Sequence, residues 1–403
     1  MIRKNMSNNL GLFYLRMLLL STFISCVPLL RILGLNVSLQ FIGWLVPLAV
    51  SLIFIFKLKR KRVFFPLQLW IPWGGVLIFG LIDSYEFGFQ RTVMSLTPLV
   101  VGVVSSMFVY DDRFKKEFDK SIKYFTIVLV LYFMYKTRLY TLTFLPFSQL
   151  SAQVMTISLL VAYYFTRFSL GFKIPVLLSL VLVVMPLAAL TRMGMIATAS
   201  VFLISFTPIK LHYRIAIIII SILVTISVFY TDRIQRSMFF SGSGSVADLS
   251  LNNVNLATSG RSYMWGIIID EFHKSTVHRD AKWFGNGANA TGDLLKQYGM
   301  RLTHPHNDWL RLLYDYGYVG VMLYVGTILF QWKYLVNKAR LARETFPRLL
   351  FYASAAAFAP YVLYMFSDNV WIYGAYFGNL HFFMIGVACS MNYNSKMTVN
   401  RSF

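Results

Sequence analysis

A short polar segment in the second half of the chain carries side chains that could perform acid–base chemistry. His304-Pro305-His306-Asn307 comes directly before a helical pattern that becomes strongly apolar after Gly317. A neutral imidazole can accept a proton from a hydroxyl near neutral pH, so we interpret His306 as a candidate general base. His304 is interpreted as a helper or a helix cap. The alternative is that His306 and Asn307 only cap the helix.

The residues after this segment have helical spacing. We expect a helix that begins near Pro305, because the first turn of a helix tolerates the missing N–H of proline. Leu310 and Gly317 follow His306 at intervals of four and eleven residues, so they would share a helical face with it. Gly317 and Gly320 would thin the helix where it enters a membrane and let another helix or a lipid approach closely.

Arg261 begins a second helical pattern, which extends over 261–274. A guanidinium at the start of such a helix can bind a phosphate through two parallel hydrogen bonds. We therefore interpret Arg261 as a candidate diphosphate ligand. The alternative is an ordinary surface arginine, or one that is paired with Asp270 or Glu271.

Arg192 lies between two apolar segments, in a turn that is too short to hold a domain. Its charge must lie at or just inside a membrane boundary, where a charged side chain is costly and is a functional candidate by default. We interpret Arg192 as a second diphosphate ligand. The alternative is a side chain that only reaches the lipid headgroups. Arg91 and Arg138 are further substrate-binding candidates of the same kind.

The histidines do not form a known metal-binding motif. Four of the six lie in one hydrophilic segment, but no spacing such as His-Glu-x-x-His is present. We therefore expect no metal and no other cofactor. The four are His273, His278, His304 and His306.

The composition indicates the setting in which these residues work. Of 403 residues, 57% are hydrophobic and 13% are charged, whereas soluble domains average about 45–50% and about 25%. The apolar residues fall in blocks of about 20, which is typical of an all-α polytopic membrane protein. The net charge of +22 does not indicate nucleic-acid binding, because the cations lie in short clusters between apolar blocks. Cys26 and Cys389 lie in separate apolar blocks, so no disulfide framework is expected.

We expect about twelve transmembrane helices and one large hydrophilic loop at 231–315. Most of the clustered Lys and Arg lie in alternate segments between spans, so the positive-inside rule predicts cytoplasmic termini and a loop on the outer side. The chain then divides into 1–230 with nine spans, the loop, and 316–403 with three spans and a cytoplasmic tail. The first span has no clear cleavage site, so we expect it to be retained. The spans are expected near 11–32, 39–56, 63–82, 92–110, 124–140, 149–165, 174–190, 193–207, 214–230, 316–332, 349–366 and 379–392.

The loop is expected to be partly helical. Its Gly-Ser-rich stretch at 241–245 is typical of a flexible linker. Further along we predict the helix over 261–274, a turn at Gly285-Asn286-Gly287 and a short helix near 293–298.

These motifs resemble those of the O-antigen ligase and O-antigen polymerase family. His306-Asn307 is followed after nine residues by Gly317-Tyr318-Val319-Gly320, and Ser259-Gly260-Arg261 is followed by Trp265. The Gly285-Asn286-Gly287 turn, the long outer loop and Thr191-Arg192-Met193-Gly194 are also similar, although family members often carry Ser before this Arg. The resemblance is strongest from about 185 to 330, and before about 180 only the row of hydrophobic helices matches.

The resemblance implies a glycosyltransferase that uses no nucleotide sugar. Its donor would be a glycan on undecaprenyl diphosphate at the periplasmic face of the bacterial inner membrane, and an acceptor hydroxyl would attack the anomeric carbon. His306 would take the proton of the hydroxyl, while Arg192 and Arg261 would hold the diphosphate without a metal. The supporting residues would be His304, Asn307, Gly317 and Gly320.

The acceptor separates two kinds of family member. A polymerase joins the glycan to another lipid-linked repeat unit, and a ligase joins it to lipid A-core. We favour a polymerase, because Ser-Gly-Arg followed by Trp, and His-Asn-Asp before the helix, are more typical of polymerases. A chain-length regulator and a flippase are the protein partners that this implies. The competing class is a transporter or flippase of lipid-linked sugars, but a transporter should show broken helices and paired halves.

Overall fold

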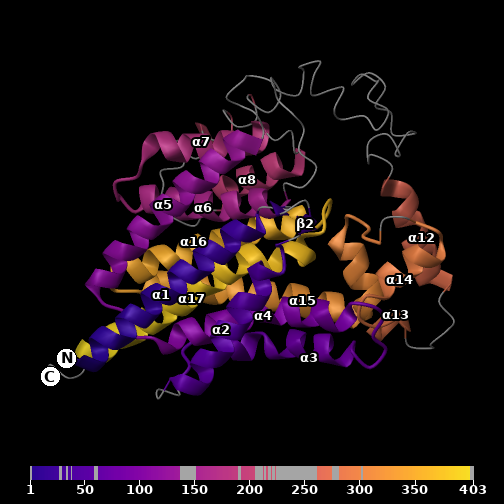
Figure 1. The fold of residues 1–403 in the computed structure, drawn as a ribbon, viewed down its shortest axis with the longest axis horizontal. Coiled ribbons are helices and arrows are strands. Elements are labelled where there is room, and N and C mark those ends of the chain that lie inside the picture. The colour runs from indigo at the N-terminus through magenta and orange to yellow at the C-terminus, as the bar shows by residue number, and fades with distance from the viewer. Residues whose placement is uncertain are drawn as a thin grey trace.

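The computed structural model of the chain is almost entirely helical (Figure 1). It describes residues 2–26, 30–32, 35–37, 39–58, 62–136, 151–188, 192–204, 261–274, 281–300 and 303–399, with five single positions between 212 and 223. Within these residues there are fourteen α-helices, one short 3-10 helix and one two-stranded sheet. The predicted linker at 241–245, nearly all of the ninth predicted span, Arg138 and His278 lie outside the described residues.

The elements follow one another along the chain with few strands among them. The first half contains α1 (Ile2–Ser25), β1 (Leu30–Ile32), β2 (Leu35–Val37), α2 (Ile42–Lys57), η1 (Leu67–Leu69), α3 (Ile71–Phe79), α4 (Gly88–Met107), α5 (Asp112–Lys136), α6 (Ser151–Ser169), α7 (Val176–Ala188) and α8 (Arg192–Ile204). The second half contains α12 (Arg261–Lys274), α13 (Ala281–Phe284), α14 (Ala290–Gln297), α15 (Asp308–Leu341), α16 (Thr345–Tyr364) and α17 (Val370–Val399).

Each predicted span other than the ninth coincides with a helix, but the first span is wrong at its end. We expected it to continue to residue 32, whereas α1 ends at Ser25. Leu30–Ile32 instead pairs with Leu35–Val37 in an antiparallel hairpin, which corrects the all-α expectation at this point. The sequence explains the early end, because Pro28 lacks a backbone N–H and disfavours helical geometry in the residue before it.

Two helices in the described part of the chain, α15 and α16, are long and apolar enough to cross a membrane by length and composition. Apolar stretches in α1, α2 and α7 are shorter. Among the described residues, fewer helices reach full spanning length than the twelve that we expected.

Among the described helices, α4 and α17 form the most extensive contact. Small residues line their seam: a Cβ atom added to Gly386 would overlap the carbonyl of Gly102 and the side chain of Ser105. Ser390 on α17 donates a hydrogen bond to the carbonyl of Phe108, just after α4. Close approach through small residues and hydrogen bonds is how helices associate where lipid removes the hydrophobic driving force.

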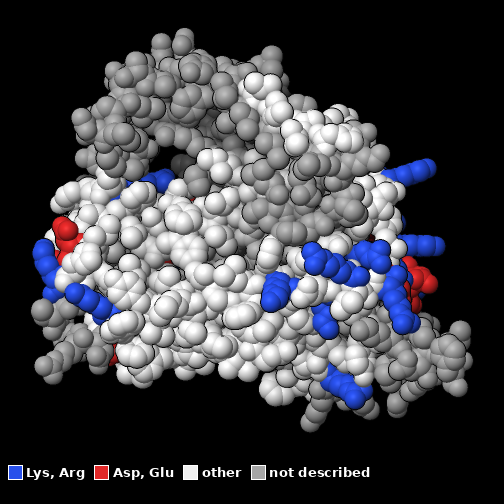
Figure 2. All heavy atoms as spheres, turned by 180° about the vertical axis from the view of Figure 1, so that it is seen from behind, with Lys and Arg blue, Asp and Glu red and all other residues white. Residues whose placement is uncertain are grey.

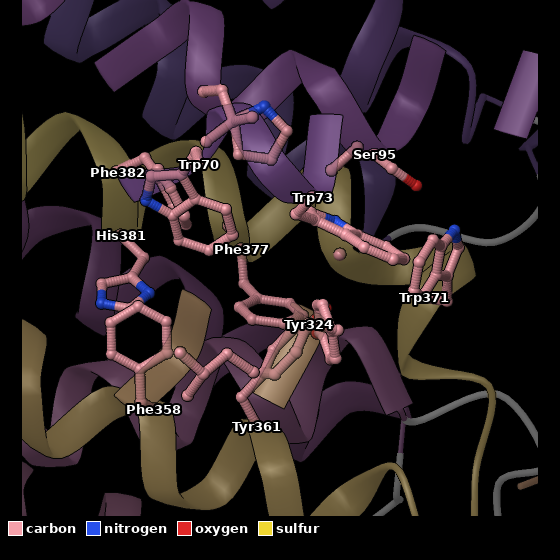
Figure 3. Close-up of a pocket in the computed structure, with 16 residues that line it drawn as sticks. Trp70, Trp73, Ser95, Tyr324, Phe358, Tyr361, Trp371, Phe377, His381 and Phe382 are labelled. Atoms are coloured by element: carbon pink, nitrogen blue, oxygen red, sulfur yellow. The ribbon is translucent and has the colours of Figure 1, made fainter. Parts of the chain in front are cut away.

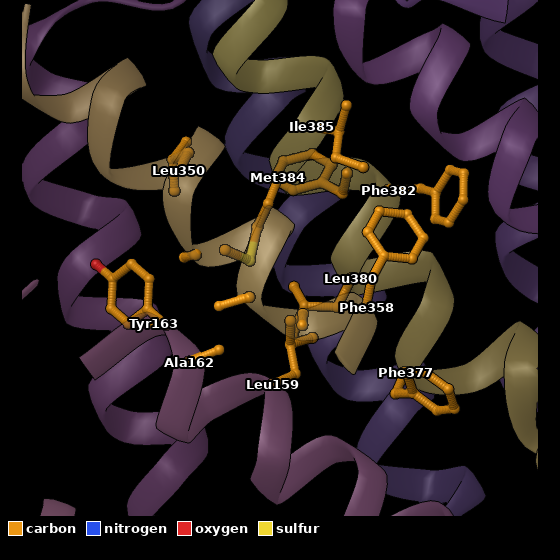
Figure 4. Close-up of a cluster of buried hydrophobic side chains, with 14 of the residues drawn as sticks. Leu159, Ala162, Tyr163, Leu350, Phe358, Phe377, Leu380, Phe382, Met384 and Ile385 are labelled. Atoms are coloured by element: carbon orange, nitrogen blue, oxygen red, sulfur yellow. The ribbon is translucent and has the colours of Figure 1, made fainter. Parts of the chain in front are cut away.

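A second block of packing joins α6, α16 and α17 (Figure 4). Leu159 and Tyr163 of α6 face Leu350 of α16 and Leu380 of α17, and all four side chains are buried. This core fixes the position of α16 relative to α17, and hence the short turn that connects them.

The start of α1 and the end of α17 lie together at one end of the molecule, and α12, α13 and α14 lie at the opposite end (Figure 1). On the face shown in Figure 2, most described Lys and Arg gather toward the end that holds α1 and α17, and the middle of the face carries few charges. The segments that carry Arg261 and His306 therefore lie at the end away from the chain termini.

Candidate active site

Asn307 sets the start of α15. Its Oδ1 accepts hydrogen bonds from the backbone N–H groups of Trp309 and Leu310, both at 3.1 Å. This cap satisfies two of the donors that a helix start leaves unpaired. The helix therefore begins at Asp308, and the expectation that it begins near Pro305 is wrong.

His306 lies outside the helix, so the expectation that it shares a helical face with Leu310 and Gly317 is also wrong. Its φ is 50°, in the left-handed region that is uncommon for residues other than glycine and costs free energy. The backbone N–H of His306 donates to Oδ1 of Asn369 at 3.0 Å and so holds this conformation. The imidazole consequently lies against the turn between α16 and α17.

The imidazole is held at one nitrogen only. Nδ1 lies 3.3 Å from Oδ1 of Asp368 and 3.2 Å from Nδ2 of Asn369. The side chains of His306 and Asp368 are 27% and 17% exposed. Nε2 has no hydrogen-bond partner in the described part of the chain. The ring is therefore oriented at Nδ1 and open to a ligand at Nε2.

The carboxylate of Asp368 decides which nitrogen carries the proton. Nδ2 of Asn369 can only donate and the carboxylate can only accept, so Nδ1 can bond to one of them at a time. A hydrogen bond to a charged group is stronger than one to a neutral amide, so we assign the proton to Nδ1. Nε2 then keeps its lone pair and can accept a proton, and Asp368 stabilises the imidazolium that results. Of the alternative that His306 and Asn307 only cap the helix, the part about Asn307 is confirmed, whereas His306 supplies no capping hydrogen bond among the described residues.

Sequence reasoning missed Asp368 and Asn369. They belong to the turn between α16 and α17 and lie 62 and 63 residues after His306. A signal was present: Ser367-Asp368-Asn369 is a polar triplet between two apolar spans, on the same predicted side as the 231–315 loop. That signal marks a boundary, however, and does not tell which histidine the carboxylate would contact.

Arg261 reaches the same turn from α12, whose predicted bounds are confirmed. Its Nη1 donates to the carbonyl of Ser367. One helical turn further on, Trp265 donates its Nε1–H to the carbonyl of Pro305 at 2.8 Å. The helix therefore contacts both the α16–α17 turn and the segment that carries His306. Arg261 and His306 therefore contact neighbouring residues, Ser367 and Asp368, of the turn between α16 and α17.

The expected alternative, in which Arg261 pairs with an acidic residue of its own helix, is wrong. Glu271 accepts a hydrogen bond from the hydroxyl of Tyr298 at 2.7 Å and lies 3.5 Å from Nζ of Lys274. No carboxylate pairs with Arg261 among the described residues. Its guanidinium thus keeps donors that a phosphate could occupy.

His304 is not a helix cap either. Its Nδ1 lies 3.2 Å from Nη2 of Arg91, in the first turn of α4. Burial, followed by the positive charges of Arg91 and Arg311, lowers the pKa of His304 to about 3. The ring is therefore neutral at pH 7 and accepts the Arg91 hydrogen bond at Nδ1, which places its own proton on Nε2. Arg91 and His304, which the sequence indicated as separate candidates, are therefore in direct contact.

Of the two glycines of α15, Gly317 makes room for another helix as expected. Gly317 has φ 67° and ψ −170°, a conformation that only glycine adopts readily, and it kinks α15. A Cβ atom at Gly317 would overlap the carbonyl of Trp283 in α13. A Cβ atom at Gly320 would overlap the side chain of Tyr316 in its own helix and would lie 3.5 Å from Val76 in α3, which is an ordinary van der Waals distance. Only Gly317 of the two is therefore needed for the approach of another helix.

The segment between α13 and α15 also has the predicted local structure. Gly285 and Gly287 have φ of 82° and 100°, which confirms the turn. The short helix expected near 293–298 is α14, Ala290–Gln297.

A buried polar network fixes α14 and α17 to the start of α15. Arg311 is nearly fully buried, and its Nε lies 3.3 Å from Oδ2 of Asp315. The other oxygen of Asp315 accepts from the N–H and the hydroxyl of Thr291, both at 2.7 Å. Asp308 accepts from the backbone N–H of Trp371 at 2.6 Å. Removing one partner from such a network costs about 3–5 kcal/mol, so it stabilises the site as a unit.

Aromatic side chains hold Trp371 in place (Figure 3). Its ring centroid lies 5.3 Å from that of Trp73 and 5.8 Å from that of Tyr324. The cavity within this cluster is only about 50 Å³, well below the size of a ligand site. The cluster therefore supports the site rather than binding substrate.

Residues 174–325 match the protein family described as O-antigen ligase. The chain carries an O-antigen ligase family domain. The resemblance predicted for about 185 to 330 is thereby confirmed. No curated protein matches the chain. The matched domain contains Arg192, Arg261, His304, His306, Gly317 and Gly320.

Members of the O-antigen ligase family are polytopic membrane proteins that transfer lipid-linked glycans. The domain does not include all of the site described above. Arg91 precedes it, and Asp368 and Asn369 follow it in the chain. The site of this O-antigen ligase family domain is thus completed by α4 and by the α16–α17 turn.

Two of the predicted arginines are not placed by the described residues. Arg192 is the first residue of α8, but its side chain lies outside the described part, and Arg138 lies outside it altogether. Their substrate-binding roles stay predictions. Among the described residues no group of three His, Cys, Asp or Glu could hold a metal ion, and the absence of a metal from the O-antigen ligase family reaction stays an expectation as well.

Proposed function

We propose that this protein is a surface-polysaccharide (O-antigen) polymerase. It transfers a glycan from undecaprenyl diphosphate to a hydroxyl of another lipid-linked repeat unit. The observation that carries the proposal is the imidazole of His306, which is oriented by Asp368 at Nδ1 and open at Nε2 within an O-antigen ligase family domain. This is the arrangement that a general base for an acceptor hydroxyl needs.

In the proposed step the acceptor oxygen attacks the anomeric carbon of the donor sugar. A new carbon–oxygen bond forms, and the bond between that carbon and the diphosphate oxygen breaks. The proton of the hydroxyl moves to Nε2 of His306, and the electron pair leaves with undecaprenyl diphosphate. Asp368 lowers the energy of the transition state because the imidazolium charge develops next to its carboxylate.

Arg261 and Arg192 are proposed to hold the diphosphate. Arg261 is fixed through one nitrogen to Ser367 and has donors left for a phosphate oxygen. Negative charge grows on the diphosphate as the bond breaks, and a prepositioned guanidinium stabilises that charge without a metal. The role of Arg192 rests on its place in the family domain and at the start of α8.

We place the reaction at the periplasmic face of the bacterial inner membrane, with both termini in the cytoplasm. Two observations support this orientation. The ends of α1 and α17 lie opposite α12, α13 and α14 (Figure 1), and the described cations concentrate toward the end that holds α1 and α17 (Figure 2). Positive clusters are retained on the cytoplasmic side. The 231–315 loop, between 1–230 and 316–403, would then carry the periplasmic half of the site.

An O-antigen ligase is the second candidate, because the matched family carries that description. Its acceptor would be lipid A-core. The lipopolysaccharide ladder of a deletion strain separates the two functions. Core plus a single repeat unit is expected if the polymerase is lost. Bare core with accumulated lipid-linked polymer would show instead that the protein is the ligase. Bare core with single lipid-linked units retained on the inner leaflet would favour a flippase.

A further inference from the structure

A pocket beside His304 takes no part in the proton transfer and diphosphate binding described above. Its volume is about 340 Å³, which is within the range of small-molecule sites. It lies where α2, α4 and α17 begin, next to the segment before α15, and we call it the Arg91 pocket. Its lining includes Gln40, Trp44, Gln90, Arg91, His304 and Trp371.

Arg91 is the one charged side chain among the residues that line the Arg91 pocket. No Asp or Glu lines it, and in the described part of the chain the guanidinium of Arg91 bonds only to Nδ1 of His304. The buried carboxylates Asp308 and Asp315 attract Arg91 from outside the pocket, and Asp315 is already paired with Arg311. An anionic ligand in the pocket would give Arg91 a direct counter-ion.

His304 adds a neutral ring beside this charge. Its Nδ1 accepts the hydrogen bond from Arg91, and the ring also hydrogen-bonds the backbone of Thr303. The ring therefore fixes one nitrogen of the guanidinium. The remaining donors of Arg91 suit a carboxylate or a phosphate group.

The rest of the lining suits a sugar better than a bare phosphate. Trp44 and Trp371 provide aromatic surface, and Trp371 is held rigid by its contact with Trp73. One face of a pyranose ring consists of C–H groups, which pack well on an aromatic ring. Gln40 and Gln90 provide amides that can both donate to and accept from sugar hydroxyls. A lipid phosphate alone would leave these groups without a role.

We propose that the Arg91 pocket binds a negatively charged sugar of the acceptor glycan, with Arg91 holding its carboxylate or phosphate group. The word acceptor rests on the proposed function, in which His306 deprotonates the acceptor hydroxyl. One residue separates His304 from His306, so their Cα atoms are at most about 7 Å apart. A sugar bound at His304 would thus present the next sugar of the chain to the base.

Binding of two matched probes to the purified full-length protein in detergent tests this. Methyl glucuronide and methyl glucoside differ only in the carboxylate, and their dissociation constants can be measured by saturation-transfer NMR. We expect the glucuronide to bind roughly tenfold or more tightly, the usual effect of a hydrogen-bonded charge. Arg91→Gln should remove that difference. Arg16→Gln, which changes an exposed arginine paired with Glu117, should keep it.

Three results would overturn the inference. The wild-type protein could bind both probes equally, Arg91→Gln could keep the preference, or inorganic phosphate could compete as well as the glucuronide, which would make the pocket a plain anion site. If Arg91→Gln does not fold, the wild-type comparison and the phosphate competition decide alone. The probes need no turnover, so an unchanged polysaccharide ladder in the deletion strain would remove the proposed function while an Arg91-dependent preference would still support the charged-sugar site.

Discussion

Replacement of Asp368 by Asn should slow glycan transfer, because it removes the charge that stabilises protonated His306 while keeping the shape of the side chain. The two groups are 3.3 Å apart, and a hydrogen bond to a charged group is worth about 1.5–3 kcal/mol. Both side chains are partly exposed, so water weakens the interaction and we expect the lower half of this range. The rate should therefore fall by roughly ten- to fortyfold.

The assay is transfer between lipid-linked glycans by the purified protein. We expect the loss in kcat, with little change in KM, because the imidazolium forms only as the hydroxyl proton moves. His306→Asn serves as the reference and should cost roughly a hundredfold or more. Asparagine tolerates the left-handed backbone of His306 better than most residues do, and the cap at Asn307 is untouched, so this variant should fold normally.

The double variant decides whether Asp368 acts through His306. Residues that work as a unit have non-additive effects, so the double variant should be no slower than His306→Asn alone. A normal rate for Asp368→Asn would refute the assignment of the proton to Nδ1. Multiplied losses in the double variant would refute the coupling and leave Asp368 with a separate role.

Four further outcomes are expected. Arg261→Lys keeps the charge but loses the planar fork, so activity should fall roughly tenfold at normal protein level, and full activity would exclude two-point binding of the diphosphate. Gly317→Ala should lower the free energy of unfolding by about 2 kcal/mol or more, and with it the thermal midpoint, because of the backbone conformation of Gly317 and the nearby carbonyl of α13. The control Gly326→Ala should be neutral, because its Cβ would meet no atom closer than 4.0 Å. Ser243→Cys should react with a membrane-impermeant thiol reagent in cells whose outer membrane alone is permeabilised, and reaction only after lysis would reverse the orientation. Between the ordinary histidine pKa of about 6.5 and the folded value of about 3, only the unfolded chain takes up a proton at His304, so stability should fall from pH 7 to pH 5, and His304→Gln should flatten that slope in thermal melts.

The sequence alone was sufficient for features that depend on neighbours along the chain. Apolar blocks of about 20 residues and the pattern over 261–274 predict helices because a helix closes its hydrogen bonds within its own segment. The motif from His306 to Gly320 is contiguous, so the sequence alone also indicated the family. The start of α15 was wrong because two local signals compete, and the Asn307 cap, with two hydrogen bonds, outweighs the mere tolerance of Pro305 in a first turn.

Only the tertiary structure decided which residues share the site. His306 meets Asp368 across 62 residues, and His304 meets Arg91 across 213. Such pairs depend on the register between helices, and register is set by whole contact surfaces, such as the small-residue seam of α4 and α17. No spacing within a single segment encodes that register. His306 could therefore be predicted from its own motif. The contact of Asp368 with His306 and that of Arg91 with His304 depend on how the helices pack, so only the tertiary structure reveals them.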